Sequence, residues 1–172
     1  RAWCAHCVKG KCKGSQHRKV DEEVKHEEQI PVISADYMFM SDKQKQEEEK
    51  GMPILVVKDR RTKVIRARVV PEKGKHWYAV KILGGIVGSL AYRRFILKSD
   101  QEPAIMNLKE GVKNESGPIE IMFEESPTYD SQGNGEIEHA VQVVQGQFRS
   151  MKDALESRYG VRFNGDHVCI PW

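Results

Sequence analysis

The sequence predicts an α/β fold, a mixed five-stranded sheet whose first three strands are antiparallel and whose faces are covered by helices. Apolar runs rich in β-branched residues come first, and segments of helix and strand length then alternate toward the C-terminus. Strands joined by a short turn pair antiparallel, whereas strands separated by a helix pair parallel. This order of elements therefore indicates a mixed sheet between helical layers.

Each expected element has its own signal. Pro31 introduces the first apolar run, and the turn of the following hairpin lies near Asp59–Thr62. Pro103 suits the first turn of the second helix, and Gly160 stops the last one. The glycines of the first helix could allow close packing, and the His76-Trp77-Tyr78 run that opens it is expected to pack against the protein rather than to stack on bases. The expected elements are strand 31–39, hairpin 54–70, helix 76–91, strand 93–100, helix 102–112, strand 118–125 and helix 135–159.

Composition allows one domain of ordinary size with a short appendage. The 172 residues are 39% hydrophobic, and no apolar run approaches the roughly 18 residues of a membrane span, so no membrane partner is expected. The net charge of +3 is unevenly distributed, because residues 1–20 hold six Lys/Arg and no acid, whereas 114–148 hold seven acids and no Lys/Arg. A basic tail suits nucleic acid, and an acidic zone suits metal or is only a solvated face.

Two aspartates stand out. Asp36 interrupts an apolar strand, where an unpaired carboxylate would cost several kcal/mol and so needs a metal, a base or hydrogen bonds. Asp100 follows the apolar run FILKS and precedes a helix that begins near Pro103. Asp36 could instead cap a loop, and Asp100 could be the N-cap of that helix. Together they are candidates for catalysis and for binding Mg²⁺ or Mn²⁺.

The last helix offers a third carboxylate, either Glu136 or Glu138. These glutamates lie about 100° to either side of an apolar stripe, so they cannot both face one site. The flank of Glu138 continues with polar residues that could contact nucleic acid, whereas the flank of Glu136 suits packing against protein, which favours Glu138. The stripe consists of Ile137, Val141, Val144, Phe148, Met151 and Leu155, and the polar flank of Gln142, Gln145, Arg149 and Lys152.

At these residues the chain resembles the catalytic core of retroviral and long-terminal-repeat retrotransposon integrases, within the ribonuclease H-like superfamily. The matching pieces are SADYMFM, LKSDQEPA and GNGEIEHAVQ, and the resemblance runs from about Ile30 to the C-terminus. It implies an Asp-Asp-Glu site with two Mg²⁺ or Mn²⁺ ions. It also implies 3′-end processing and joining of element DNA to target DNA, with double-stranded DNA as partner and a homo-oligomer in the full-length protein.

The resemblance leaves the glutamate as a choice. Thirty-five residues separate Asp100 from Glu136, a spacing that members of this family often have. Glu138 instead fits the family's Gly-x-x-Glu step from Gly135, and together with the flank this makes Glu138 the expected catalytic residue. Many members have a DNA-contacting lysine four residues later, where this chain has Gln142, so DNA affinity would rest more on Arg149 and Lys152.

The N-terminal cysteines suggest zinc. Cys4 and Cys7 form a C-x₂-C pair, the usual half of a tetrahedral zinc site. In the resembling family the other two ligands are histidines further upstream, so Zn²⁺ is expected in the intact parent protein. The expected organisation is a zinc-domain remnant over 1–20, a charged linker over 21–29 and a C-terminally truncated core over 30–172. Four unevenly spaced cysteines indicate a reducing compartment, hence an intracellular location. The resemblance implies the nucleus or a cytoplasmic element particle.

Two other functions remain open. A catalytically silent nucleic-acid or protein-interaction module from a decayed element would bind DNA without acid-dependent Mn²⁺ uptake. A ribonuclease H-type hydrolase would usually have a fourth acid near the metals, and the sequence offers no convincing candidate.

Overall fold

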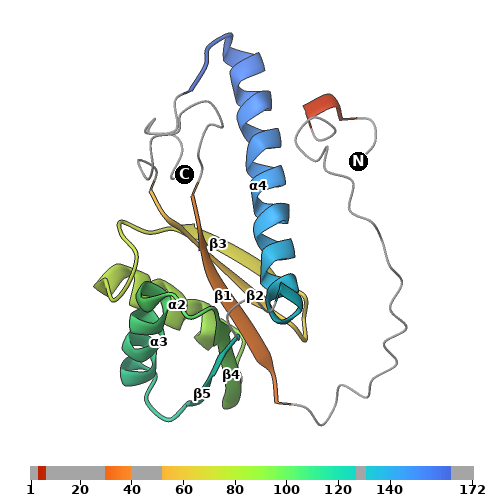
Figure 1. Cartoon of the computed structure of the whole chain (residues 1–172). Coiled ribbons are helices and arrows are strands. Elements are labelled where there is room, and N and C mark those ends of the chain that lie inside the picture. The colour runs from red at the N-terminus through yellow and green to blue at the C-terminus, as the bar shows by residue number, and fades with distance from the viewer. Residues whose placement is uncertain (1–3, 7–29, 40–51, 127–130, 164–172) are drawn as a thin grey trace, which may run out of the picture.

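The computed structural model describes residues 4–6, 30–39, 52–126 and 131–163, with the side chains of 131–133 left out. One mixed sheet lies between two layers of helices (Figure 1). Within the described residues, none of the helices combines the length and hydropathy that crossing a membrane requires.

Five strands form the sheet in the order β3-β2-β1-β4-β5. β1 pairs antiparallel with β2, and β2 pairs antiparallel with β3, whereas β4 is parallel to both β1 and β5. The predicted mixed sheet, with its antiparallel first three strands, is confirmed. The strands are β1 (Val32–Met38), β2 (Ile54–Asp59), β3 (Ile65–Val69), β4 (Arg94–Ser99) and β5 (Glu120–Glu125).

The helices cover opposite faces of the sheet (Figure 1). α2 (Trp77–Ser89) and α3 (Pro103–Glu115) pack on one face, over the larger core that includes Ile33, Leu55 and Phe95. α4 (Ser131–Tyr159) packs on the other face, where the side chains of alternate strand residues meet it. That smaller core consists of Met38, Ile54, Val56, Ile137 and Ala140.

Helix starts differ from their expected positions for local reasons. α3 has Glu102 as N-cap and Pro103 in its first turn, so Asp100 is not the N-cap. α4 begins at Ser131 rather than at 135, although Gly133 and Gly135 are poor helix formers. The Ser126 hydroxyl lies 2.5 Å from the side-chain oxygen of Asn134, a contact that ties this first turn to the end of β5.

The glycines of α2 do not pack closely as expected. A methyl group added at Gly84, Gly85 or Gly88 would meet no atom within 4 Å. The close approach is at Gly111 of α3, where a Cβ would lie 2.7 Å from Cγ2 of Val80. Contact between α2 and α3 therefore depends on the α3 glycine.

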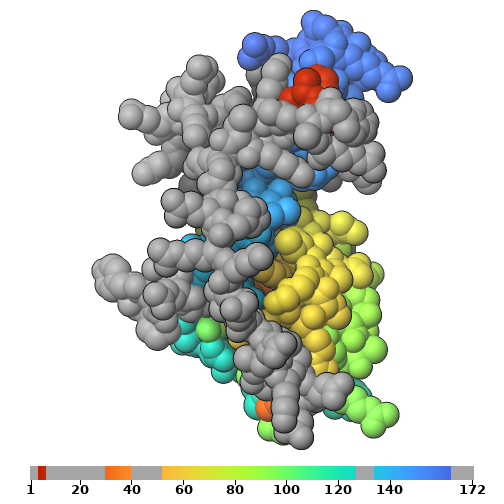
Figure 2. All heavy atoms as spheres, turned by 90° about the vertical axis from the view of Figure 1, so that its right-hand side faces the viewer, coloured from red at the N-terminus to blue at the C-terminus, as the bar shows by residue number. Residues whose placement is uncertain are grey.

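α4 is longer than the sheet that it covers. Its 29 residues span about 43 Å at 1.5 Å per residue. The sheet-facing core extends along the helix only to Val144, and Met151 of the expected apolar stripe is 59% exposed. The C-terminal half projects beyond the strands, with residues 4–6 beside it (Figures 1 and 2). There the His6 ring contacts the Asp153 carboxylate.

Candidate active site

The parallel pairing of β1 and β4 brings the two predicted aspartates together. The register pairs Val32 with Ile96 and Ser34 with Lys98, so two residues further along Asp36 lies level with Asp100. Asp36 is also the cross-strand partner of Val56, whose side chain belongs to the core beneath α4. Both aspartates therefore lie at the C-terminal ends of neighbouring parallel strands, on the face that α4 covers.

Burial and neighbouring negative charge act together on the Asp36 carboxylate. Burial raises the pKa of Asp36 from 3.8 to about 6, and the charges of Asp100 and Glu102 add to the rise. The Tyr37 backbone N–H donates to Asp36 Oδ1 at 2.7 Å, and this bond acts to lower the pKa of Asp36. Asp100 Oδ1 accepts from the Glu102 backbone N–H at 3.2 Å. The two carboxylates form a partly buried negative pair, whose charge a bound cation would neutralise.

Two residues that the sequence analysis missed sit beside this pair. Lys73 Nζ lies 2.7 Å from Glu102 Oε1 and 4.8 Å from the centre of the Phe39 ring. Glu102 thus places a third carboxylate in the electrostatic field of Asp36, with Lys73 as its counter-ion. A Glu following the Asp100 position by two residues is visible in the sequence, but nothing in the sequence pairs it with Lys73.

Lys109 of α3 forms a hydrogen bond to Ser99 at the C-terminal end of β4. Its side chain is only 1% exposed, and Nζ donates to Ser99 Oγ at 3.1 Å and to the Glu124 carbonyl at 3.2 Å. Burial lowers the pKa of Lys109, while the charges of Glu125 and Asp100 oppose that change. Because Ser99 immediately precedes Asp100, these bonds fix the backbone that carries the second aspartate. The sequence signal that could have revealed this role is the position of Lys109 among the apolar residues of α3.

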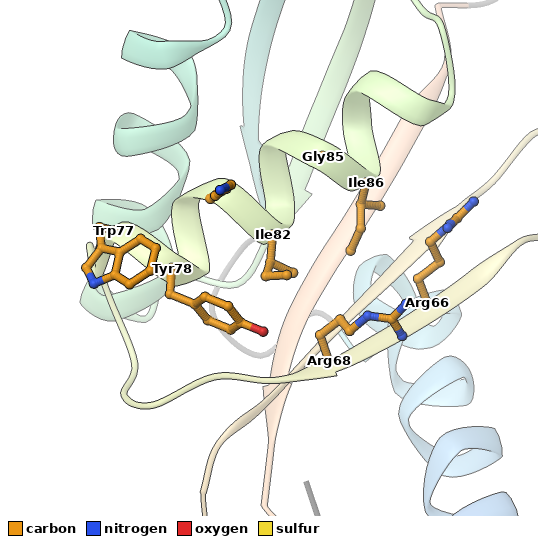
Figure 3. A pocket seen from close by; sticks show the side chains of 8 residues that line it. Arg66, Arg68, Trp77, Tyr78, Ile82, Gly85 and Ile86 are labelled. Atoms are coloured by element: carbon orange, nitrogen blue, oxygen red, sulfur yellow. The ribbon is translucent and has the colours of Figure 1, made fainter. Parts of the chain in front are cut away.

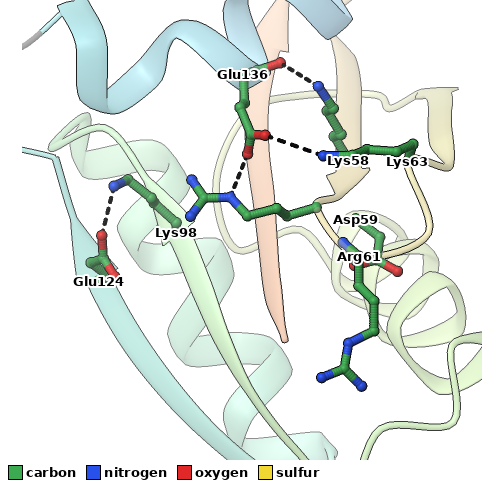
Figure 4. A network of polar contacts seen from close by, with 8 residues as sticks. Lys58, Asp59, Arg61, Lys63, Lys98, Glu124 and Glu136 are labelled. Carbon is green, nitrogen blue, oxygen red and sulfur yellow. Dashed lines mark hydrogen bonds and ion pairs between the residues drawn. The ribbon is translucent and has the colours of Figure 1, made fainter. Parts of the chain in front are cut away.

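Glu136 is engaged by basic residues away from the aspartates. Its carboxylate accepts from Arg60 Nε at 2.6 Å and lies 3.8 Å from Lys63 Nζ, and Lys58 Nζ donates to its backbone carbonyl at 3.3 Å (Figure 4). Partial burial acts to raise the pKa of Glu136, but the bond and charge of Arg60, with Lys58 and Lys63, hold it below its usual range. These cations come from the end of β2 and the turn after it, next to the outer strand β3.

Glu138 lies on the opposite flank of α4 and is exposed. Ile137 faces the sheet between the two glutamates, and Glu136 turns toward β2, so Glu138 is directed toward the β4–β5 side. Asn134, one turn earlier on that flank, contacts Ser126 at the end of β5. Along the same flank Gln142 and Arg149 are exposed, and Gln145 and Lys152 are half-buried. Lys152 Nζ lies 3.8 Å from Glu156 Oε1.

The structure thus brings Asp36 and Asp100 together but leaves Glu138 apart from them. In the described part of the chain, no three His, Cys, Asp or Glu side chains are grouped closely enough to hold a metal ion. The donors still suit Mg²⁺ or Mn²⁺, because two carboxylates at adjacent strand ends are the hard oxygen ligands these ions prefer. Of the expected zinc ligands, Cys4 is half-buried, and Cys7 lies outside the described residues.

Comparison with solved structures identifies the fold. The catalytic core domain of BIV integrase superposes with a TM-score of 0.50 and 18% identity, over 72% of each chain. The chain has the fold of a retroviral integrase catalytic core. A chain of the simian T-cell lymphotropic virus intasome, in complex with PP2A regulatory subunit B56 gamma, matches with a TM-score of 0.54 and 12% identity. That match covers 75% of this chain and 42% of the other. No protein-family model and no curated protein sequence matches the chain.

In this integrase-core fold the predicted aspartates occupy the C-terminal ends of two central parallel strands. Ligands of open α/β sheets gather beyond such strand ends. The fold therefore supplies a suitable place for the predicted chemistry.

Proposed function

We propose that this chain is the catalytic core of a retroelement integrase, a polynucleotidyl transferase that processes the 3′ ends of element DNA and joins them to target DNA. Asp36, Asp100 and Glu138 are the proposed catalytic and metal-binding residues. The observation that carries the proposal is the parallel pairing of β1 with β4. Its register, continued two residues past Ser34 and Lys98, brings Asp36 level with Asp100 beneath α4, and the charge of Asp100 raises the pKa of Asp36.

The two aspartates would hold divalent cations. The raised pKa of Asp36 reports a carboxylate whose charge is poorly compensated by the protein, and a cation beside it would compensate that charge. Two Mg²⁺ or Mn²⁺ ions held there would supply the positive charge needed to activate an attacking oxygen and to stabilise a leaving oxygen. Lys109 and Ser99 position the Asp100 backbone, and the Tyr37 N–H orients the Asp36 carboxylate.

Glu138 is proposed as the third ligand because Glu136 already has partners. Moving the Glu136 side chain would break its ion pairs with Arg60 and Lys63. Glu138 is exposed, so its side chain can change rotamer at little cost. It also shares its flank with the polar residues proposed to contact double-stranded DNA, namely Gln142, Gln145, Arg149 and Lys152.

Calorimetric titration of the chain with Mn²⁺ tests the assignment. We expect binding by the unaltered protein, strongly weakened binding for Asp36→Asn and Glu138→Gln, and little change for the matched control Glu136→Gln. Loss of binding in Glu136→Gln with retention in Glu138→Gln would reassign the glutamate. If the chain binds an oligonucleotide but shows no Mn²⁺ binding that Asp36→Asn weakens, it is a catalytically silent nucleic-acid-binding module.

Activity is tested separately in the full-length protein. Asp36→Asn should abolish Mn²⁺-dependent strand transfer of a labelled element-end duplex, and unchanged transfer would refute the proposal. The broader context stays part of the proposal: zinc bound through Cys4 and Cys7 in the intact parent protein, a homo-oligomer, and an intracellular site of action.

A ribonuclease H-type hydrolase is the second candidate. It is favoured by Glu102, a fourth acidic residue close enough to raise the pKa of Asp36. Its ion pair with Lys73 argues against a role as metal ligand. Cleavage of the RNA strand in an RNA–DNA hybrid, lost in Glu102→Gln, would support this candidate over strand transfer.

A further inference from the structure

A cavity of about 390 Å³ lies on the face of the sheet away from α4, between β3 and α2 (Figure 3). We call it the β3–α2 groove. Arg66 and Arg68 project into it from β3, and α2 supplies the opposite wall (Figure 3). The lining residues of α2 are Trp77, Tyr78, Lys81, Ile82, Gly85 and Ile86.

The groove exists because β3 is an edge strand that α2 does not fully cover. Ile65, Ala67 and Val69 point toward α4, so the alternating Arg66 and Arg68 point to the α2 side. Gly85 leaves that side of α2 open, since a methyl group added there would meet no atom within 4 Å.

The charge of the groove is of one sign. Its charged lining residues are Arg66, Arg68 and Lys81, and no carboxylate lines it. Across the described residues, none of these three cations forms an ion pair with an acid. Three cations around an apolar floor, without counter-charges, complement an anionic ligand.

Trp77 adds a planar apolar surface at one end of the groove. The sequence analysis expected this residue to pack against the protein, which is wrong, because its side chain is 68% exposed. Its ring lies 5.7 Å from that of Tyr78, with the planes at 80°, so Tyr78 meets it edge to face. An exposed indole beside cations is the pairing on which nucleic-acid bases stack while phosphates are held nearby.

We propose that the β3–α2 groove binds a single-stranded nucleic acid segment, with phosphates on Arg66, Arg68 and Lys81 and a base stacked on Trp77. The polar side-chain atoms of the lining are donors, apart from the Tyr78 hydroxyl, which can also accept. An acidic peptide would also need acceptors for its backbone N–H groups, so it fits the side-chain lining less well. The groove lies across the sheet from Asp36 and Asp100, so it is separate from the proposed catalytic site.

Fluorescence anisotropy with a labelled oligothymidylate of about 12 nucleotides tests the proposal. Trp77→Ala should weaken binding about fivefold or more, whereas Trp77→Phe, which keeps a stacking ring, should bind nearly normally. Arg66→Ala and Arg68→Ala should each lower the slope of log affinity against log salt by about 0.7. Arg93→Ala, an exposed cation outside the groove, is the matched control and should change neither.

Two other occupants are distinguished by the same variants. Equal oligonucleotide affinity in Trp77→Ala and the unaltered chain would overturn the proposal, as would tighter competition by polyglutamate than by oligothymidylate. Analytical sedimentation without nucleic acid measures the oligomeric state and tests whether a second copy of the chain covers the groove. If Arg66→Ala and Trp77→Ala change only the oligomeric state, a second copy of the chain covers the groove and the proposal fails. Circular dichroism confirms that each variant is folded.

Discussion

Replacement of Asp36 by Asn should make the protein more stable at neutral and alkaline pH. The folded-state pKa of Asp36 is raised from 3.8 to about 6, so folding disfavours the ionised carboxylate. At 1.36 kcal/mol per pH unit this rise corresponds to about 3 kcal/mol. Because Asp36 is only partly buried, solvent screening reduces the expected gain to about 2 to 3 kcal/mol. Asparagine keeps the amide oxygen that accepts from the Tyr37 N–H.

The sign of the pH dependence follows from linkage. A carboxyl group whose pKa is raised on folding binds more protons in the folded state, so its destabilising effect grows as pH rises from 3.8 to about 6 and is constant above. The stability difference between Asp36→Asn and the unaltered chain should be largest at pH 8 and fall to about 0.6 kcal/mol at pH 4.

Urea unfolding of both proteins at pH 4 and pH 8, followed by circular dichroism, measures this difference. Asp59→Asn is a control of opposite sign, because that carboxylate accepts from Thr62 Oγ1 at 2.6 Å and from the Tyr92 hydroxyl at 2.8 Å, bonds that an amide satisfies less well. An Asp36→Asn protein that is no more stable than the unaltered chain at pH 8 would refute the electrostatic account of the site.

Two further predictions concern α4 and α3. Glu136→Gln should lower the free energy of unfolding by about 0.5 to 1 kcal/mol at pH 7, because it weakens the ion pair with Arg60. The pKa of Glu136 is lowered on folding from its ordinary 4.5, so this loss should shrink steadily as pH falls below 4.5. A loss in urea titrations that did not shrink there would contradict the ion-pair explanation. Gly111→Ala should cost about 1 to 3 kcal/mol, since the new Cβ would lie 2.7 Å from Val80 Cγ2. Gly85→Ala, with no atom within 4 Å, should instead be neutral or stabilising by up to about 1 kcal/mol, and equal melting temperatures for the two variants would contradict the packing argument.

The antiparallel pairing of the first three strands and the places of the two aspartates along their strands could be predicted because their signals are local. Apolar runs bounded by turn residues fix which segments are strands, and chain order then fixes which pair antiparallel. The same patterns placed Asp36 inside one strand and Asp100 at the end of another. That the two lie level follows from the register of β1 against β4, which neither strand encodes alone.

The misses were contacts between distant segments. No local pattern joins Lys73 to Glu102, and nothing near Glu136 in sequence announces Arg60, 76 residues earlier. The start of α4 was missed because Gly133 and Gly135 suggest a loop, whereas packing of the helix and the contact of Asn134 outweigh their propensity. Trp77 was misjudged because an aromatic residue at a helix start gives no indication of which face is covered.

If the long α4 tilted about its contact with the sheet, it would act as a lever whose N-terminal arm, the one that carries Glu138, is very short. Its fulcrum is the sheet contact around Ala140, and Glu138 lies about 3 Å from it along the axis, whereas Asp153 lies about 20 Å away on the other side. A tilt that moves the Asp153 end by 3 Å shifts Glu138 by about 0.5 Å. A displacement of α4 at Asp153, where His6 contacts it, would therefore hardly move the glutamate relative to the two aspartates.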